Sequence, residues 1–170
     1  MVYPIVKYGD PVLETPAETI TEFNDELKKL AEDMFESMYA AHGVGLAATQ
    51  IGIGKRIAVI DVTFKEDPNA KLVLINPEII KTEGSQKGEE GCLSLPDFRE
   101  NVTRPNKVTV RAQDLEVNWF ETTGEELLAR ALVHETEHLQ GTLYISHISR
   151  LKRDLMIRKV KKLIRAGEWA

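Results

Sequence analysis

Several common features are absent from this sequence, and each absence narrows what the chain can be. The sequence has one cysteine, Cys92, which excludes a disulfide within the chain. It has no apolar run of about 18 residues, which excludes a membrane-spanning helix. Its N-terminus lacks the basic start and apolar core of a signal peptide. No repeat, low-complexity tract or linker interrupts residues 1–170, so we expect one domain with a substantial core. The single cysteine favours a location in the cytoplasm.

The charge of the chain is unevenly distributed. The net charge is −5, yet residues 150–165 hold eight basic side chains and one acidic side chain, Asp154. The remainder is therefore clearly acidic, which argues against DNA binding. The basic segment is either a solvated helix face or a docking surface. A membrane surface is the less favoured partner because the nearest aromatic residue, Trp169, follows the basic stretch.

The periodicity of apolar residues predicts an α+β fold, with mostly antiparallel strands around a central helix and a further helix at the C-terminus. An extended arm over residues 1–22 precedes a helix from Asn24 to Ala40, whose apolar residues share one face. The central helix is expected to begin near Thr123, with Thr123 and Glu126 as a capping box and Gly141 after its end. Strands are predicted at 56–62, 71–80, 106–113 and, more weakly, 116–121 and 142–148; residues 83–100 are predicted to be irregular, and the last helix to span 149–166.

The expected central helix contains the pattern His134-Glu135-x-x-His138. Histidines four residues apart lie on one face of an α-helix, where two imidazoles can bind one divalent metal. The glutamate between them can move protons at a water molecule. Apolar neighbours predict a buried helix, and buried imidazoles need partners. A metal site therefore fits better than a solvated helix face.

The sequence allows three interpretations of Cys92. A lone cysteine is most often an inert buried residue. It can also be a nucleophile paired with one of the two motif histidines. As a thiolate ligand it would complete a set of three protein ligands, which leaves a fourth position open, as in catalytic metal sites.

The segment Gly43 to Gln50 is rich in small and apolar residues and lacks the spacing of a phosphate-binding loop. It can be a tight strand edge packed on the core, or a wall that a ligand approaches closely. Gln50 can place an amide donor against a developing oxyanion.

Taken in order, GVGLAATQ, EGCLS and HETEH resemble the three signature motifs of the peptide deformylases. The resemblance extends over essentially the whole chain, and the helical C-terminus is similar to one bacterial subgroup. It implies a metal-dependent hydrolase that removes the formyl group from the N-terminal formylmethionine of newly made polypeptides. It also implies docking of the basic C-terminal helix on ribosomal RNA.

The same resemblance assigns a role to individual positions. Cys92, His134 and His138 match the metal ligands, usually of ferrous iron, with zinc, nickel or cobalt as alternatives. Glu135 matches the catalytic acid/base, and Gln50 and the backbone N–H of Leu93 match the oxyanion donors. Gly45 matches a backbone position that pairs with a substrate bound as an added strand. The positions that match the surroundings of the methionine side chain are Val44, Leu93, Arg99, Leu127 and Ala131.

Glu137 departs from the family pattern, which most often has aspartate at this position. The longer side chain can alter a contact next to the metal site, and Arg104 is its expected partner. Two other functions compete with deformylation. A His-Glu-x-x-His endopeptidase would take its third ligand from a downstream residue, and His147 does not have the required spacing. A non-catalytic RNA-binding protein would not need the intact set of ligands and glutamate.

Overall fold

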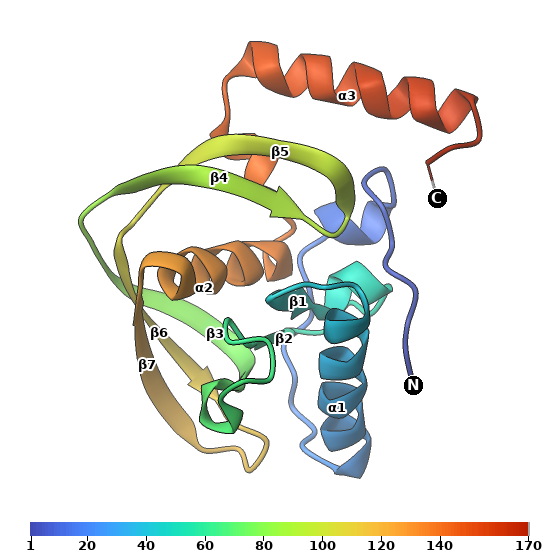
Figure 1. Cartoon of the computed structure of the whole chain (residues 1–170). Helices are drawn as coiled ribbons and strands as arrows, with labels where there is room; N and C mark the ends of the chain where they lie inside the picture. Colours follow the sequence, from blue (N-terminus) through green and yellow to red (C-terminus); the bar gives the residue numbers. More distant parts are fainter. Residues whose placement is uncertain (170) are drawn as a thin grey trace.

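The computed structural model describes residues 1–169, in which helix α2 (Glu126–Leu139) lies between two antiparallel sheets (Figure 1). The larger sheet has the strand order β1-β2-β3-β6-β7 and the smaller one pairs β4 with β5. The strands are β1 (Gly45–Ala47), β2 (Ile57–Ile60), β3 (Leu72–Glu83), β4 (Gln86–Cys92), β5 (Leu95–Arg104), β6 (Lys107–Gln113) and β7 (Trp119–Glu125). The predicted α+β class is confirmed.

Helix α1 (Asp25–Ala40) begins where its cap predicts. The Asn24 side chain accepts a hydrogen bond of 3.0 Å from the backbone N–H of Leu27. The predicted apolar face is buried and packs on strand β2, in a cluster that includes Leu27, Ala31, Met34, Phe35, Met38, Ile57 and Val59. This packing fixes α1 against the sheet on the side where β1 forms the edge.

Residues 83–100 are not irregular, as expected from their polarity, but form most of the β4–β5 ribbon. A two-stranded ribbon exposes much of its surface, so its strands carry charged side chains and give no apolar signal. Two glycines lie on the ribbon where a side chain would crowd an arginine. A Cβ at Gly91 would lie 2.8 Å from an Nη atom of Arg99, and one at Gly88 would lie 3.1 Å from Nη2 of Arg130.

The predicted start of the central helix is wrong by about one turn. Thr123 belongs to β7, and its hydroxyl lies 2.8 Å from that of Thr109 on β6. Strand pairing continues to Glu125, and α2 begins at the next residue without a side-chain cap. Leu127 does not pack in the core, since it is 51% exposed. Gly141 follows the helix with φ 82°, as the glycine signal predicts.

The C-terminal part differs from expectation in two details. Residues 142–148 do not form a strand; Tyr144–His147 is a 3₁₀ helix that buries Tyr144. Helix α3 (Arg150–Arg165) has the expected bounds, with Ser149 as its cap. The apolar residues whose periodicity predicts this helix are largely exposed, because α3 contacts the body mainly through Met156 and Val160.

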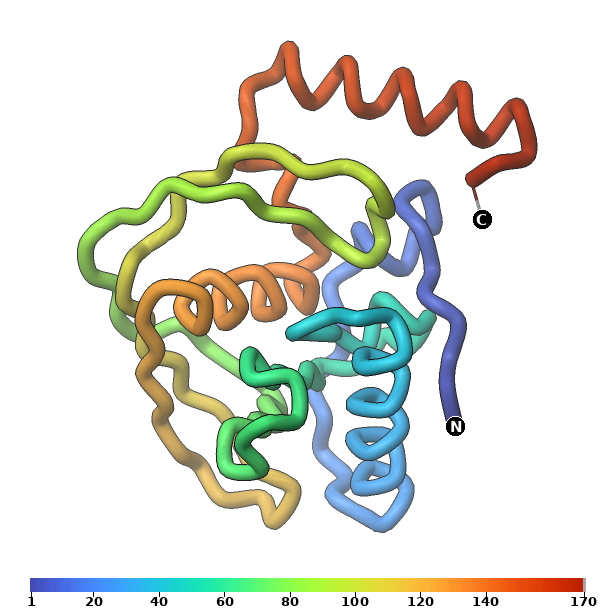
Figure 2. Tube along the Cα trace, in the orientation of Figure 1, coloured from blue at the N-terminus to red at the C-terminus, as the bar shows by residue number. Residues whose placement is uncertain are grey.

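Helix α3 lies outside the ribbon and runs back towards the N-terminal arm (Figures 1 and 2). Its far end is held there by Trp169, whose Nε1 donates a 2.8 Å hydrogen bond to the carbonyl of Tyr8. Within residues 1–169, no helix has the length and apolarity needed to cross a membrane.

Candidate metal centre and active-site pocket

Helix α2 and strand β4 bring three potential metal ligands together. His134 and His138 lie one turn apart on α2, with their Nε2 atoms 3.1 Å apart. The Sγ atom of Cys92, at the end of β4, lies 3.3 Å from Nε2 of His138. All three donor atoms lie within 4.8 Å of one another. A thiolate and two imidazoles are the donor types that bind zinc or ferrous iron, so these residues fit a divalent metal.

Glu90 orients one of these imidazoles. Its Oε2 lies 2.6 Å from Nδ1 of His134 and also accepts a 2.7 Å hydrogen bond from Arg104. Its Oε1 accepts hydrogen bonds from Arg104 and Arg130. Burial raises the pKa of Glu90, but hydrogen bonds from His134 and Arg104 outweigh it and hold the pKa well below its usual range. The ionised carboxylate therefore keeps Nδ1 of His134 occupied and directs Nε2 to the metal centre.

The expected contact of Glu137 with Arg104 is present at 2.7 Å. The second carboxylate oxygen of Glu137 lies 2.7 Å from Nε2 of His147, a partly exposed side chain. The glutamate side chain thus connects the buried guanidinium of Arg104 with His147 at the surface. The sequence offered no role for His147, because its contact depends on the turn after α2.

Glu135 lies in the wall of the pocket and is buried. Burial raises its pKa to about 7. Its Oε1 is enclosed and has no hydrogen-bond partner among residues 1–169. A Cβ placed on Gly45 would lie 2.4 Å from its Oε2, so the strand can pass the carboxylate only because a glycine is there. A carboxyl group with this pKa can take up and release a proton near neutral pH.

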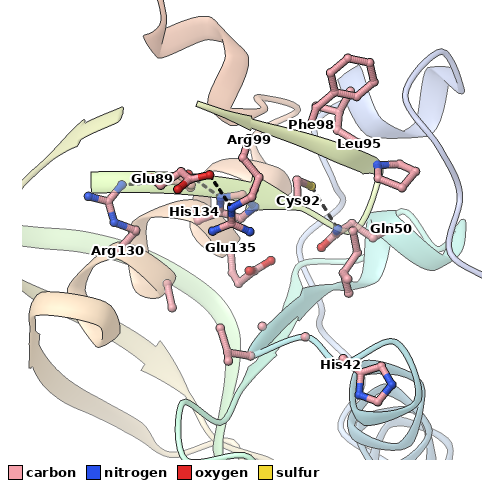
Figure 3. Close-up of a pocket in the computed structure, with 18 of the residues that line it drawn as sticks. His42, Gln50, Glu89, Cys92, Leu95, Phe98, Arg99, Arg130, His134 and Glu135 are labelled. Atoms are coloured by element: carbon pink, nitrogen blue, oxygen red, sulfur yellow. Dashed lines mark hydrogen bonds and ion pairs between the residues drawn. The ribbon is translucent and has the colours of Figure 1, made fainter. Parts of the chain in front are cut away.

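Gln50 is held with its amide nitrogen towards Cys92 (Figure 3). Its Oε1 accepts a 3.0 Å hydrogen bond from the backbone N–H of Ala47. Its Nε2 lies 3.5 Å from the cysteine sulfur and 3.3 Å from Oγ of Ser94. This arrangement leaves the amide donor beside the metal centre, where it can stabilise negative charge.

These groups open onto a pocket of about 620 Å³ between α2, β1 and the ribbon. In Figure 3, His134 and Glu135 from α2 face Cys92 and Gln50. Every substrate-contact position expected from the sequence lines this pocket: Val44, Gly45, Leu93, Arg99, Leu127 and Ala131. Strand β1 is an edge of the larger sheet and borders the pocket, so a peptide can pair with it.

Sequence reasoning missed Glu90, Arg130 and His42, which also line the pocket. A signal for Glu90 existed. Side chains two residues apart share a face of a strand, and Glu90 precedes Cys92 by two. Because residues 83–100 were expected to be irregular, nothing distinguished Glu90 from its exposed neighbour Glu89.

Comparison with known proteins gives a consistent result. The model of the family described as Polypeptide deformylase matches residues 2–154. A peptide deformylase from Acidobacterium capsulatum is 65% identical over 99% of both chains, and one from Endomicrobium trichonymphae is 47% identical over 97% of both. Among solved structures, the peptide deformylase from Legionella pneumophila has a TM-score of 0.90 at 41% identity, covering 98% of both chains. The Thermus thermophilus peptide deformylase has a TM-score of 0.90 at 40% identity, covering 100% of both.

Proposed function

This chain belongs to the polypeptide deformylase family, and on that premise we propose which of its residues remove the formyl group from the N-terminal formylmethionine of newly made polypeptides. The family is a group of metal-dependent hydrolases, and formate is the second product. We further propose that residues 1–170 act as one catalytic domain.

Cys92, His134 and His138 are the proposed ligands of one divalent metal. The convergence of their donor atoms supports this assignment, as does the carboxylate of Glu90 behind His134. Ferrous iron is the proposed native metal, and zinc, nickel or cobalt can replace it. When bound, the metal supplies Lewis-acid activation of a water molecule and of the formyl carbonyl.

Glu135 is the proposed acid/base. It takes a proton from the attacking water and returns a proton to the amine that leaves with the peptide. The Nε2 of Gln50 and the backbone N–H of Leu93 donate hydrogen bonds to the oxyanion that forms on the formyl carbon. The buried, unpaired Oε1 of Glu135 and its pKa of about 7 support this role.

The substrate is proposed to pair with the edge of β1 near Val44 and Gly45. Its methionine side chain enters the part of the pocket lined by Leu93, Arg99, Leu127 and Ala131. Specificity from such an apolar pocket is limited, because one methylene contributes about 1–3 kcal/mol.

One observation carries the proposal: three metal donors and a buried glutamate converge beside an edge strand that can bind a peptide. The experiment is formate release from formyl-Met-Ala-Ser, before and after removal of the metal with a chelator. We expect metal-dependent formate release and no cleavage of casein. Casein cleavage without formate release would favour an endopeptidase instead.

We also propose that α3 docks on ribosomal RNA in the cytoplasm, where nascent chains emerge. Most basic side chains of α3 are exposed, including Arg158, Lys159, Lys161 and Lys162. Reversing the charge of Lys159 and Lys162 should weaken co-sedimentation with ribosomes, and raising salt should weaken it for the wild type. Unchanged co-sedimentation of a folded variant would contradict docking through α3.

A further inference from the structure

A line of hydrogen bonds leads from the metal centre to the surface of the molecule. It starts at His134, whose Nδ1 lies 2.6 Å from Oε2 of Glu90. Glu90 is held by Arg104, and Arg104 also binds Glu137. The line ends at His147, whose side chain is 37% exposed, whereas those of Arg104 and Glu90 are at most 4% exposed. A side chain at the surface is therefore connected to a proposed metal ligand.

The guanidinium of Arg104 joins two carboxylates. Its Nε and Nη2 atoms donate hydrogen bonds of 3.0 and 2.7 Å to the two oxygens of Glu90. Its Nη1 atom donates a 2.7 Å hydrogen bond to Oε1 of Glu137. Because a guanidinium is planar and rigid, its position on one carboxylate also sets its position on the other. A displacement of Glu137 is therefore transmitted to Glu90.

His147 restrains the carboxylate of Glu137. The second carboxylate oxygen lies 2.7 Å from Nε2 of His147, and because a carboxylate only accepts hydrogen bonds, Nε2 is the donor. Without this contact, the carboxylate is free to rotate about its last bond and to leave Arg104. The aspartate that is usual at position 137 in the family is one methylene shorter, so the link depends on the glutamate of this chain.

The turn after α2 places His147. In this turn Gly141 has φ 82°, and a Cβ there would lie 2.8 Å from a carbonyl oxygen of the N-terminal arm. The 3₁₀ helix that ends at His147 follows. It begins with Tyr144, whose ring stacks on the imidazole of His134, with centroids 6.2 Å apart and an interplanar angle of 23°. Because Tyr144 is buried, the helix that carries His147 is fixed beside the metal centre.

We propose that His147 is a positioning residue for the metal centre, which acts through Glu137 to hold the imidazole of His134 in the orientation that binds the metal. This inference rests on the proposed function and adds to it a surface side chain on which metal retention depends. Residues that directly contact a metal ligand contribute about 10–100-fold to metal affinity. His147 lies further from the metal, so its effect is smaller.

The test uses Co²⁺-loaded protein and follows its visible absorption, which depends on the ligands and their geometry. The decay of this absorption after a chelator is added gives the rate of metal release. We expect His147→Ala to change the absorption and to release Co²⁺ about two- to tenfold faster than the wild type, below the effect of a residue that contacts the ligand itself. His147→Gln, which can donate from a similar position, should restore the wild-type rate. His147→Phe, which keeps a ring but has no donor, should not.

Two controls separate this role from a general effect on stability. Lys152→Ala removes a side chain of α3 that pairs with Glu100 on β5 at 3.0 Å, and it should leave the release rate unchanged. In a Glu137→Ala background, His147→Ala should change the rate no further, because its connection to His134 is already broken. If His147→Ala is less stable in urea but keeps the wild-type absorption and release rate, its role is structural and the proposal is overturned.

Failure of this inference and failure of the proposed function give different results. If the wild type binds no Co²⁺, or releases no formate from formyl-Met-Ala-Ser with Co²⁺ bound, the proposed function fails. If the wild type does both and His147→Ala releases Co²⁺ at the wild-type rate, only the positioning role fails. Release that His147→Ala accelerates equally in the Glu137→Ala background overturns the connection through Glu137, and the proposal with it.

Discussion

Replacing Glu90 by glutamine removes the negative charge of a buried carboxylate beside the metal centre. The carboxylate pairs with Arg104 and Arg130 and holds His134, and all four side chains are less than 10% exposed. Glutamine keeps the size but leaves two guanidinium groups without this counter-charge. Loss of one partner from a buried ion pair costs about 3–5 kcal/mol, and we expect the free energy of unfolding to fall by that amount.

The neighbouring Glu89 provides a matched control. Its side chain is 62% exposed and pairs with Arg99, which is 58% exposed. Exposed pairs of this kind contribute about 0–1 kcal/mol, so Glu89→Gln should barely change the free energy of unfolding. Urea unfolding followed by circular dichroism measures both variants. The proteins should be metal-free, because metal binding to the native state would itself add stability.

The pH dependence of the Glu90→Gln effect has a defined sign. Burial raises the pKa of Glu90, but hydrogen bonds from His134 and Arg104 lower it further, so the folded pKa lies below the ordinary value of 4.5. The stabilisation is therefore complete above pH 4.5 and is lost as the pH falls towards the folded pKa. The difference between wild type and Glu90→Gln should shrink in acid. If Glu90→Gln is no less stable than Glu89→Gln at neutral pH, the charge of Glu90 does not stabilise the fold through Arg104 and Arg130.

Three other predictions concern single positions. Gly45→Ala places a Cβ 2.4 Å from Oε2 of Glu135, which must displace this carboxylate. The displacement should lower kcat for formyl-Met-Ala-Ser by about 10²-fold. An unchanged kcat would mean that Glu135 need not hold this position. In Glu137→Asp, the aspartate side chain is too short to reach Arg104 and His147 together, so the free energy of unfolding in urea should fall by about 0.5–1.5 kcal/mol. Adding His147→Ala to this variant should lower it no further, and additive losses would show that the two residues act separately. Asn24→Ala removes the cap of α1 and should lower the free energy of unfolding, measured by thermal unfolding, by about 0.5–2 kcal/mol without changing kcat/KM. A smaller loss would show that the Asn24 side chain does not stabilise the helix as a cap.

The helices at the two ends of the molecule were predictable because their signals are local. Asn24 and Ser149 each cap a helix through a hydrogen bond within the next turn, and the bounds follow from that contact. The ribbon was not predictable in the same way. Its strands are stabilised by pairing with each other, and their charged side chains carry no apolar alternation.

Competition between local and cross-strand signals explains the misplaced start of α2. Thr123 and Glu126 have the spacing of a capping box, but Thr123 is opposite Thr109 in the β6–β7 ladder. Pairing with β6 outweighed the local helix signal, so Thr123 belongs to a strand. The metal-ligand candidates were easier to find from sequence, because helical spacing joins His134 to His138 and the family motif identified Cys92.

His42 shows the limit of motif reasoning. It directly precedes the first motif, yet no motif indicates that it lines the pocket. Sequence patterns did identify Glu137 as unusual and named Arg104 as its partner, which the structure confirms.

The central claim is that Cys92, His134 and His138 bind the metal while Glu135 moves the protons. Glu135→Gln tests it most directly, with elemental analysis of anaerobically purified protein and formate release from formyl-Met-Ala-Ser measured on the same sample. We predict that the variant keeps about one metal ion per chain, as the wild type does, and that its kcat falls by about 10²–10⁴-fold. A metal-loaded variant that hydrolyses the substrate at the wild-type rate would contradict the account.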